Sequence, residues 1–175
     1  MKRLFIIILC LILNSCYEGT SSSELFELYN RKQNELENVC TKFLNDTSID
    51  WICIASSFDS SKCESINKWT RCNFKKWESF DEKEQKTIYL LSKEDVLKHE
   101  NISVEDYNFY FNFLKTNKLW KIMKVYKCDN CIDLEGGLNG LRFSKDKNYQ
   151  FKEDFEYQKV EKLNENWYTY SRDWN

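Results

Sequence analysis

The sequence predicts an α+β domain in which N-terminal helices pack on a C-terminal antiparallel β-meander. Before residue 119, apolar residues recur at steps of three and four in several segments, which is the period of an amphipathic helix. Serines stand three positions before an acidic residue at several of these helix starts, a spacing typical of a capping box. After residue 119, short stretches of β-forming residues alternate with turns that contain Gly or Asn.

The first predicted helix covers about residues 22–45. Ser21 and Glu24 form its capping pair, and an apolar row runs along one side of it as far as Phe43. A polar run then ends the helix. Residues 49–55 follow as a short apolar stretch, which is typical of a buried strand.

The middle of the chain carries weaker patterns. It begins with a Ser-rich predicted loop and a stretch of β-forming residues that predicts a strand, over residues 56–63 and 64–78. Ser79 and Glu82 have capping-box spacing, which predicts a helix over residues 80–91. The run Thr87–Leu91 fits a strand equally well, so this alternative stays open.

Two further capping pairs predict short helices. Ser92 with Asp95 opens a helix that ends near His99, and Ser103 with Asp106 opens one that ends near residue 116. Aromatic residues in the second segment also alternate as they would in a strand. The capping pair favours the helix.

From residue 119 onward the pattern predicts strands. Trp120–Tyr126 is rich in β-forming residues, Cys128–Cys131 predicts a turn, and a Gly-rich stretch at 136–140 predicts a second break. Residues 155–163 and 167–171 flank an Asn-Glu-Asn connection, which is a hairpin signal. We therefore expect residues 119–172 to form the meander. No repeat and no long linker divides the chain, so we expect one domain.

Residues 1–16 have the pattern of an export signal. Two basic residues follow Met1, an apolar run covers residues 4–13, and Asn14-Ser15-Cys16 ends the segment. The run is shorter than the roughly 20 apolar residues that a membrane-spanning helix needs. The Leu-Asn-Ser-Cys ending resembles the lipobox of bacterial lipoproteins.

This resemblance implies a lipid on Cys16, because in that class the thiol receives a diacylglyceryl group and the chain is cut before it. We therefore expect residues 1–15 to be a signal peptide and residues 16–23 to be the lipidated cysteine with a short polar tether. Residues 24–175 would form a single globular domain in the bacterial cell envelope. Tyr17 rather than an aspartate follows the cysteine, so the resemblance favours the periplasmic face of the outer membrane over the inner membrane.

Charge limits the classes of partner. Residues 1–15 contain two basic residues and no acid, so 26 minus 2 leaves 24 basic residues against 28 acidic ones, a net charge of −4. Nucleic acids are bound through an excess of Lys and Arg, so we predict no nucleic-acid partner. The same balance gives no attraction to anionic lipid. The lipid on Cys16 is therefore the predicted membrane contact.

Six cysteines remain once Cys10 is removed and Cys16 is lipidated. An even number of cysteines in an exported chain predicts disulfides, and six of them allow about 15 pairings that sequence does not separate. We expect the pairings that are local in sequence: Cys40 with Cys53, Cys63 with Cys72, and Cys128 with Cys131.

Two other roles for these cysteines are weaker. Cys128 and Cys131 have the spacing of a thiol-redox motif, which in thioredoxin-like enzymes lies at a helix N-terminus, but the Gly-rich stretch that follows argues against a helix. Zinc binding would add Cys63 and Cys72, whose spacing is wide for a zinc site, and an oxidising compartment disfavours free thiolates. We predict no metal and no cofactor.

The C-terminal segment concentrates aromatic residues. Alternation along a strand places Tyr168 and Tyr170 on one face and Trp167 on the other. If exposed, these rings and Trp174 would form a surface for a protein or sugar partner. In the alternative, one aromatic row lies in the core. The single histidine, His99, lies in a charged stretch and is predicted to be solvated rather than to act as a general base.

These observations predict a binding protein rather than an enzyme. We expect a non-enzymatic, membrane-anchored lipoprotein that binds another envelope protein, and an immunity or inhibitor protein that blocks a toxin or hydrolase is the specific version. The first alternative is a glycan- or small-ligand-binding lipoprotein that uses the C-terminal aromatics. The second is a thiol-redox enzyme that uses Cys128 and Cys131.

Overall fold

The computed structural model of the chain describes residues 19–54, 63–73 and 75–172. Over these ranges the protein has three helices and one antiparallel sheet of ten strands, so the predicted α+β class is confirmed with a larger share of strand than expected. The predicted signal peptide, Cys16 and most of the predicted 56–63 loop lie outside the described residues, as does Trp174.

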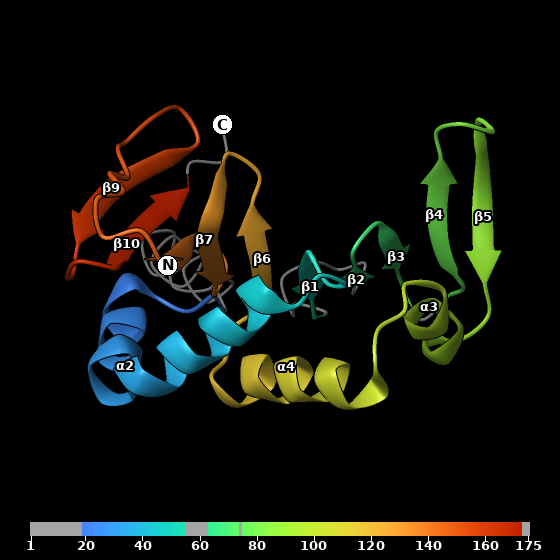
Figure 1. Ribbon diagram of the computed structural model, residues 1–175, viewed down its shortest axis with the longest axis horizontal. Helices are drawn as coiled ribbons and strands as arrows, with labels where there is room; N and C mark the ends of the chain where they lie inside the picture. Colours follow the sequence, from blue (N-terminus) through green and yellow to red (C-terminus); the bar gives the residue numbers. More distant parts are fainter. Residues whose placement is uncertain (1–18, 55–62, 74, 173–175) are drawn as a thin grey trace, which may run out of the picture.

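The sheet extends from one end of the molecule to the other (Figure 1). Its strand order is β5-β4-β3-β2-β1-β6-β7-β8-β10-β9. The short strands β1, β2 and β3 stand in the middle, between longer strands on both sides. In chain order the strands are β1 Trp51–Cys53, β2 Glu64–Ile66, β3 Trp69–Arg71, β4 Trp77–Asp81, β5 Lys86–Leu90, β6 Lys121–Val125, β7 Cys128–Glu135, β8 Asn139–Ser144, β9 Tyr157–Lys162 and β10 Trp167–Arg172.

One row of apolar side chains crosses the sheet and belongs to the core. Ile66, Ile52, Ile122, Leu134 and Leu141 stand in register on neighbouring strands from β2 to β8, and all are buried. They form a single cluster with the apolar sides of the helices. We call this side of the sheet the helix face and the opposite side the far face, because side chains alternate between them.

Helix α2, Ser22–Asn45, begins with the predicted capping box of Ser21 and Glu24. Its apolar row includes the buried residues Leu25 and Phe43, and the helix contacts β7, β8 and β10. The backbone leaves helical geometry at Lys32, where the axis kinks. Helix α2 therefore consists of two helical segments joined at Lys32.

Helices α3, Lys93–His99, and α4, Val104–Thr116, begin at Ser92 and Ser103, as predicted. Both serines accept a hydrogen bond from the backbone of the acidic residue three positions later. Helix α4 packs on α2 through an edge-to-face contact of Phe43 and Tyr110, whose ring centres lie 4.9 Å apart. Helix α3 contacts both α4 and β5, so it links the outer strands to the body.

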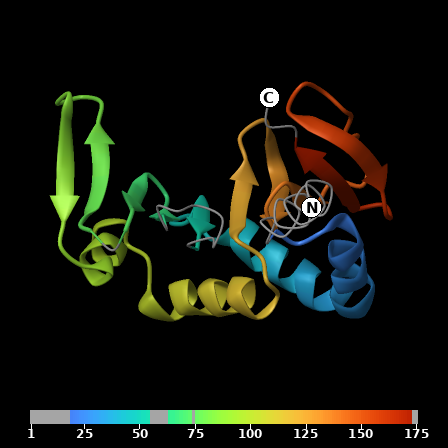
Figure 2. The ribbon, with the colours of Figure 1, turned by 180° about the vertical axis from the view of Figure 1, so that it is seen from behind.

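The predicted helix over residues 80–91 is wrong. These residues form the β4–β5 hairpin, at the outer end of the sheet in Figures 1 and 2. Ser79, the predicted cap, is a buried strand residue, and the Asp81 carboxylate instead accepts hydrogen bonds from the turn amides of Lys83 and Glu84. The β-forming run Thr87–Leu91 therefore outweighs the capping spacing.

Two further predictions differ in detail. The predicted turn at Cys128–Cys131 is the first part of β7, and the turn lies at residues 126–127. The predicted meander is observed from β6 to β8, but β10 then pairs with β8 and separates β8 from β9. The segment between β8 and β9 is long enough to carry the chain past the position next to β8. That position is then free for β10, the second strand of the last hairpin.

The folded part of the chain begins before residue 24, the predicted boundary. Thr20 is buried, its hydroxyl donates to the backbone oxygen of Lys118 at 2.7 Å, and its backbone oxygen accepts from the Asn139 side chain at 3.1 Å. A Cβ on Gly136 would overlap the Thr20 side chain. The start of α2 is therefore attached to the β7–β8 turn, and part of the predicted tether belongs to the fold.

Candidate functional site

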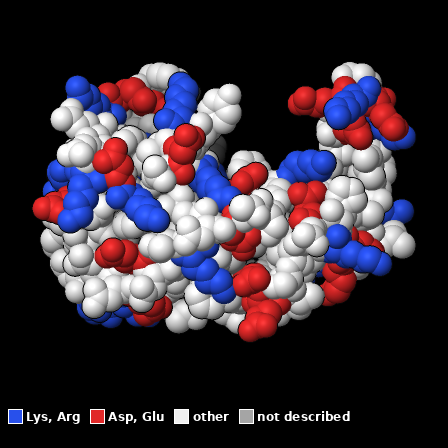
Figure 3. Space-filling view, viewed as in Figure 1, with Lys and Arg blue, Asp and Glu red and all other residues white. Residues whose placement is uncertain are grey.

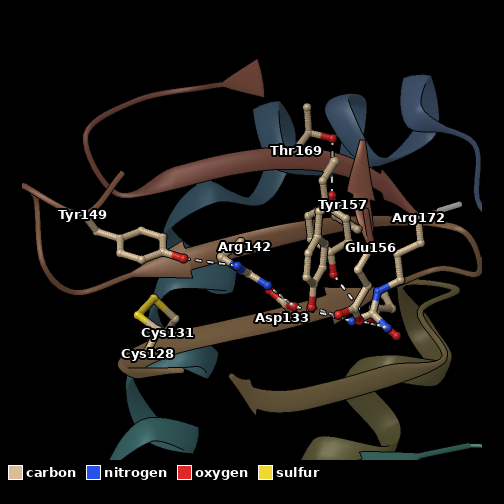
Figure 4. A network of polar contacts seen from close by, with 12 residues as sticks. Cys128, Cys131, Asp133, Arg142, Tyr149, Glu156, Tyr157, Thr169 and Arg172 are labelled. Carbon is tan, nitrogen blue, oxygen red and sulfur yellow. Dashed lines mark hydrogen bonds and ion pairs between the residues drawn. A yellow bond between two sulfur atoms is a disulfide. The ribbon is translucent and has the colours of Figure 1, made fainter. Parts of the chain in front are cut away.

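The far face of the C-terminal strands carries a buried network of charged side chains (Figure 4). Ile132 and Leu134 of β7 point to the helix face, so alternation sends Asp133 and Glu135 to the far face. Arg142 from β8 binds the two oxygens of Asp133 through its Nε and Nη2 atoms, each at 2.7 Å. This bidentate geometry is the strongest that an arginine and a carboxylate form. We call these residues, with Arg172, the arginine–carboxylate network.

Arg172 of β10 completes the network. Its Nη2 lies 2.7 Å from the Glu135 carboxylate and donates to the Tyr157 hydroxyl at 2.8 Å, and its Nη1 lies 3.2 Å from Glu156. Lys121 of β6 approaches the second oxygen of Glu135 at 3.3 Å. Positive and negative groups are therefore matched, which is the condition under which charges are tolerated inside a protein.

Aromatic rings close this face. The Arg142 guanidinium lies 3.8 Å from the ring centre of Phe151 and 4.6 Å from that of Tyr157, and it donates to the Tyr149 hydroxyl at 3.1 Å. Burial alone would lower the pKa of Arg142, but the Asp133 carboxylate raises it above the usual value. The guanidinium of Arg142 thus occupies the middle of the aromatic cluster. Its contacts with Tyr149 and Phe151 hold the segment of residues 145–156 against the sheet.

The predicted partner-binding aromatics are part of this interior. Trp167 is fully buried on the helix face against Tyr29 and Phe143, and Tyr168 and Tyr170 are 3% and 1% exposed on the far face. Burial raises the pKa of Tyr170 well above its usual value. The expectation of an exposed platform from these three residues is therefore wrong. Alternation identified their faces, but both faces of β10 are covered.

Two of the three predicted disulfides are present. Cys63 is bonded to Cys72 and Cys128 to Cys131, whereas Cys40 and Cys53 are free. The remaining pairing fails because Cys40 lies in α2 on the helix face, while Cys53 of β1 stands in register with Lys121 on the far face. Burial raises the pKa of Cys53 to about 11 and that of Cys40 well above its usual value, so both are held as thiols.

The geometry does not favour the redox or zinc alternatives. The Cys128–Cys131 disulfide lies in strand β7 rather than at a helix N-terminus, so no helix dipole lowers a thiol pKa there. The zinc alternative needs four thiolates together, but Cys63 and Cys72 are bonded to each other at β2–β3. Within the ranges 19–54, 63–73 and 75–172, no group of three His, Cys, Asp or Glu residues is placed to hold a metal ion.

A polar cluster missed by the sequence predictions joins β1, the β2–β3 turn and the end of α3. Asn67 donates to the Ser48 backbone oxygen and to the Glu100 carboxylate at 2.8 and 2.9 Å. Glu100 also accepts from the indole of Trp69 at 2.8 Å, and its Oε1 lies 3.1 Å from Nδ1 of His99. Burial would raise the pKa of Glu100, but these donors lower it below its usual value.

His99 is half-exposed, and its ring packs edge to face on Trp69 with 5.1 Å between ring centres. A carboxylate beside an imidazole can orient a general base. No serine or cysteine of the described residues is among its hydrogen-bond partners, so this pair resembles a structural cross-link more than a catalytic dyad.

The terminal hairpin β4–β5 has one buried and one exposed apolar face. Trp77 and Ser79 are buried, and the residues paired with them, Leu90 and Ile88, pack against the core. On the other face Phe80 and Tyr89 are 55% and 58% exposed, and Leu91, just beyond the strand, is 76% exposed. We call Phe80, Tyr89 and Leu91 the hairpin row. The prediction of a helix here hid this row, although the strand alternative for Thr87–Leu91 contained its signal.

The hairpin is one wall of a notch in the molecular surface (Figure 3). The other wall is the end of the molecule built from β6–β10, and the short strands β1–β3 lie between the two walls. Charged side chains gather at the tip of the hairpin, where the turn contains Glu82, Lys83 and Glu84. The hairpin row is therefore an apolar strip with a charged rim, on a hairpin that packs on the core by its other face.

No helix in the described part of the chain is both long and apolar enough to span a bilayer. Comparisons of the chain with protein-family models, with curated proteins and with solved structures find no match. The candidate site therefore rests on this chain's own geometry, and the hairpin row is its most exposed apolar feature that several side chains share.

Proposed function

We propose that this protein is a non-enzymatic, lipid-anchored envelope protein that binds another protein through the hairpin row. The observation that carries the proposal is the exposure of Phe80, Tyr89 and Leu91 on a hairpin whose opposite face is buried. Large apolar side chains that gather on an exposed face mark interaction sites more often than scattered ones do. Aromatic residues are also enriched in protein interfaces.

The support beneath the hairpin row favours recognition by a preformed surface. Trp77 is fully buried on the reverse side of the hairpin, and the Arg71 guanidinium lies 5.0 Å from its ring centre. Helix α3 follows β5 in the chain and contacts it, which supports the end of the hairpin opposite the turn. A binding surface that is already ordered loses less conformational entropy on association. The charged turn at the tip would form the polar rim that such interfaces have.

The proposed location rests on residues 1–16. Their basic start, short apolar run and Leu-Asn-Ser-Cys ending support export and lipidation of Cys16. Within this proposal, an immunity or inhibitor protein is the specific version, because a small anchored domain is placed where toxins and hydrolases reach the envelope. The glycan-binding alternative loses most of its support, since Trp167, Tyr168 and Tyr170 are buried; Trp174 lies outside the described residues.

The experiment uses the product of the neighbouring gene as bait, because immunity genes usually adjoin their toxin genes. We would compare binding of the full chain with that of Phe80→Ser and Leu91→Ser variants. The matched control is Phe155→Ser, which removes an apolar ring that is 90% exposed but lies in the 145–156 segment. We expect the two hairpin variants to lose binding by at least about tenfold, the equivalent of 1.4 kcal/mol, and the control to keep it.

Equal binding by all four chains would contradict the hairpin row as the binding surface. If the neighbouring product does not bind, the same variants would be compared by cross-linking in intact cells. A cross-linked protein lost in both hairpin variants and retained in Phe155→Ser would support the binding role without the immunity version. For that version, cells that express the neighbouring product should survive with the wild-type chain or with Phe155→Ser, and should not survive with either hairpin variant.

A further inference from the structure

The two edge strands of the described sheet, β9 and β5, differ in how they are protected. On β9, the Glu153 carboxylate accepts a hydrogen bond from the backbone of Val160 at 3.1 Å. Lys159 has a positive φ of 48°, and the β9–β10 register shifts at a bulge. Three of the six residues of β9 are also charged. Bulges, irregular backbone and charges are the features that keep an edge strand from pairing with another chain.

Strand β5 lacks these protections within the described residues. It pairs with β4 in unbroken register from Lys86 to Leu90, and its other side has no strand neighbour. Its sequence, Lys-Thr-Ile-Tyr-Leu, carries one charge at the outer end and otherwise favours strand structure. Figures 1 and 2 both show β5 as the outermost element at its end of the molecule. An open, regular edge of this kind is a template for another strand.

We propose that β5 pairs edge to edge with β5 of a second copy of this chain, antiparallel and with its two-fold axis at Tyr89. A symmetric dimer requires each surface to complement itself, so that residues i and j contact each other twice. With the axis at Tyr89, the two Tyr89 side chains stand opposite each other. Thr87 then faces Leu91 of the partner, and Ile88 faces Leu90.

This register is favourable on both faces of the sheet. On the helix face, Ile88 and Leu90 are half-buried and already border the core, so the pairing extends a continuous apolar layer. On the far face, the two Tyr89 side chains form a direct cross-strand aromatic pair, and such pairs stabilise the pairing of antiparallel strands. No charged residue stands opposite a like charge within the paired residues.

Charge also selects the antiparallel direction. A parallel pairing in register would place Lys86 beside Lys86 and the turn residue Glu84 beside Glu84, and like charges directly opposite are destabilising. The antiparallel pairing instead brings Lys86 toward the base of the other hairpin, where α3 begins. The exposed acids Glu94 and Asp95 lie in that first turn. Lys86, which pairs with Glu84 of its own turn, would then lie near these acids rather than opposite a second Lys86.

The pairing uses the edge of the hairpin and leaves the face that carries the hairpin row open. The hairpin rows of the two copies would then lie side by side, on either side of the β5–β5 pairing. This inference does not depend on the proposed function, because self-association is measured without any other protein.

The test is disulfide cross-linking of the full chain in intact cells. In a Tyr89→Cys variant the two new cysteines would stand directly opposite, at about 4.5–5.5 Å between Cα atoms, which is within the range of a disulfide. We expect a covalent dimer on a non-reducing gel after mild oxidation. The wild-type chain sets the background from native thiols, and Tyr126→Cys, at a side chain that is 94% exposed on the β6–β7 turn, is the surface control.

A second pair of variants tests the register. In a Thr87→Cys chain the new cysteines would be four residues out of step, about 14 Å apart, and should not link to each other. Co-expression of Thr87→Cys with a differently tagged Leu91→Cys chain should yield the mixed dimer. Absence of the Tyr89→Cys dimer, or equal linking at Tyr126→Cys, would overturn the proposal. So would efficient self-linking of Thr87→Cys.

Sedimentation of the full chain in detergent gives an independent readout. The wild-type mass should rise toward that of a dimer with concentration, and Tyr89→Lys should remain monomeric because it places two like charges on the axis. Tyr89 is exposed, so this substitution leaves the core intact. A monomer at every concentration for the wild-type chain would reject the pairing, whether or not the chain binds another protein.

Discussion

Arg142 is held by ionic contacts on one side and by aromatic rings on the other. It is 3% exposed and Asp133 is fully buried, so both charges have left water, and each depends on the other for compensation. The rings of Phe151 and Tyr157 add cation–π contacts that an apolar replacement would not provide. The single arginine therefore joins β7, β8, β9 and the 145–156 segment.

We predict that Asp133→Asn lowers the free energy of unfolding by about 3–5 kcal/mol, because it leaves the Arg142 charge buried without its partner. Urea denaturation of the purified chain measures this change. The matched control is Glu165→Gln, which breaks the exposed pair with Lys147 and should have a far smaller effect. The double variant Asp133→Leu/Arg142→Met should recover much of the lost stability. An Asp133→Asn chain as stable as the control would contradict the role of the pair.

The Glu100 cluster predicts a stability that depends on pH. The pKa of the Glu100 carboxyl group is lower in the folded chain than its usual value of 4.5. As the pH falls from 4.5 to the folded pKa, the folded chain therefore binds fewer protons than the unfolded chain. The stabilisation is therefore fully present above pH 4.5 and is lost as the pH falls below it through the folded pKa.

Thermal unfolding of the wild-type chain and a Glu100→Gln variant at pH 7 and pH 3 tests this dependence. The difference in melting temperature should be larger at pH 7 and should shrink at pH 3. Glu161→Gln, which removes an exposed carboxylate on β9, is the control and should show little difference at either pH. A difference for Glu100→Gln that grew at pH 3 would contradict the lowered pKa.

At the scale of elements, β8 and β10 depend on one glycine. Gly140 pairs with Tyr170, and a Cβ on Gly140 would overlap the Tyr170 ring. The ring therefore lies flat across β8, where it contacts Phe151 and Tyr157. An aromatic residue opposite glycine covers the exposed backbone of the strand that carries the glycine.

We predict that Gly140→Ala destabilises the protein by about 1–3 kcal/mol, because the added methyl group forces the Tyr170 ring out of its position. The same substitution in a Tyr170→Ala background should cost much less, since the overlapping ring is absent. Denaturation of the four chains of this double-mutant cycle measures the coupling. If the two substitutions were additive, the contact would not be the cause.

The helices were predictable because their signals are local. Ser21, Ser92 and Ser103 each lie next to the backbone that they cap, and sequence spacing alone specifies that contact. The same spacing at Ser79 failed, because burial of Trp77 and Ser79 against the core decides the structure there. The Asp133–Arg142 pair had no local signal, since it depends on which strands become neighbours.

Exposure was the least predictable property of the site. Alternation correctly separated Trp167 from Tyr168 and Tyr170, but it carries no information about which segments cover each face. Tyr149 and Phe151, from residues 145–156, pack on the rings of Tyr168 and Tyr170, and this placement on the far face of β10 has no signal in the strand pattern. For the same reason Tyr89, which the sequence did not distinguish, remains exposed at the end of the sheet.

At the scale of the whole molecule, the proposal depends on where the chain is held. We predict that Cys16→Ala moves the protein from the membrane fraction to the soluble fraction, because the lipid on Cys16 is the proposed anchor. Immunoblots of fractionated cells measure the distribution. Cys53→Ala removes a free, half-buried thiol and should leave the protein in the membrane. A Cys16→Ala chain that stayed in the membrane would contradict lipidation.

The docking of Thr20 on the β7–β8 turn shortens the distance between lipid and fold. Under the proposed lipidation, four residue steps join Cys16 to Thr20, a reach of about 14 Å at full extension. The body would travel with the lipid in the plane of the bilayer and could not leave its surface. Two copies would then meet by lateral diffusion in two dimensions. Such confinement raises their effective concentration, so the two strand edges would pair on the membrane at a lower total amount of protein than they need in solution.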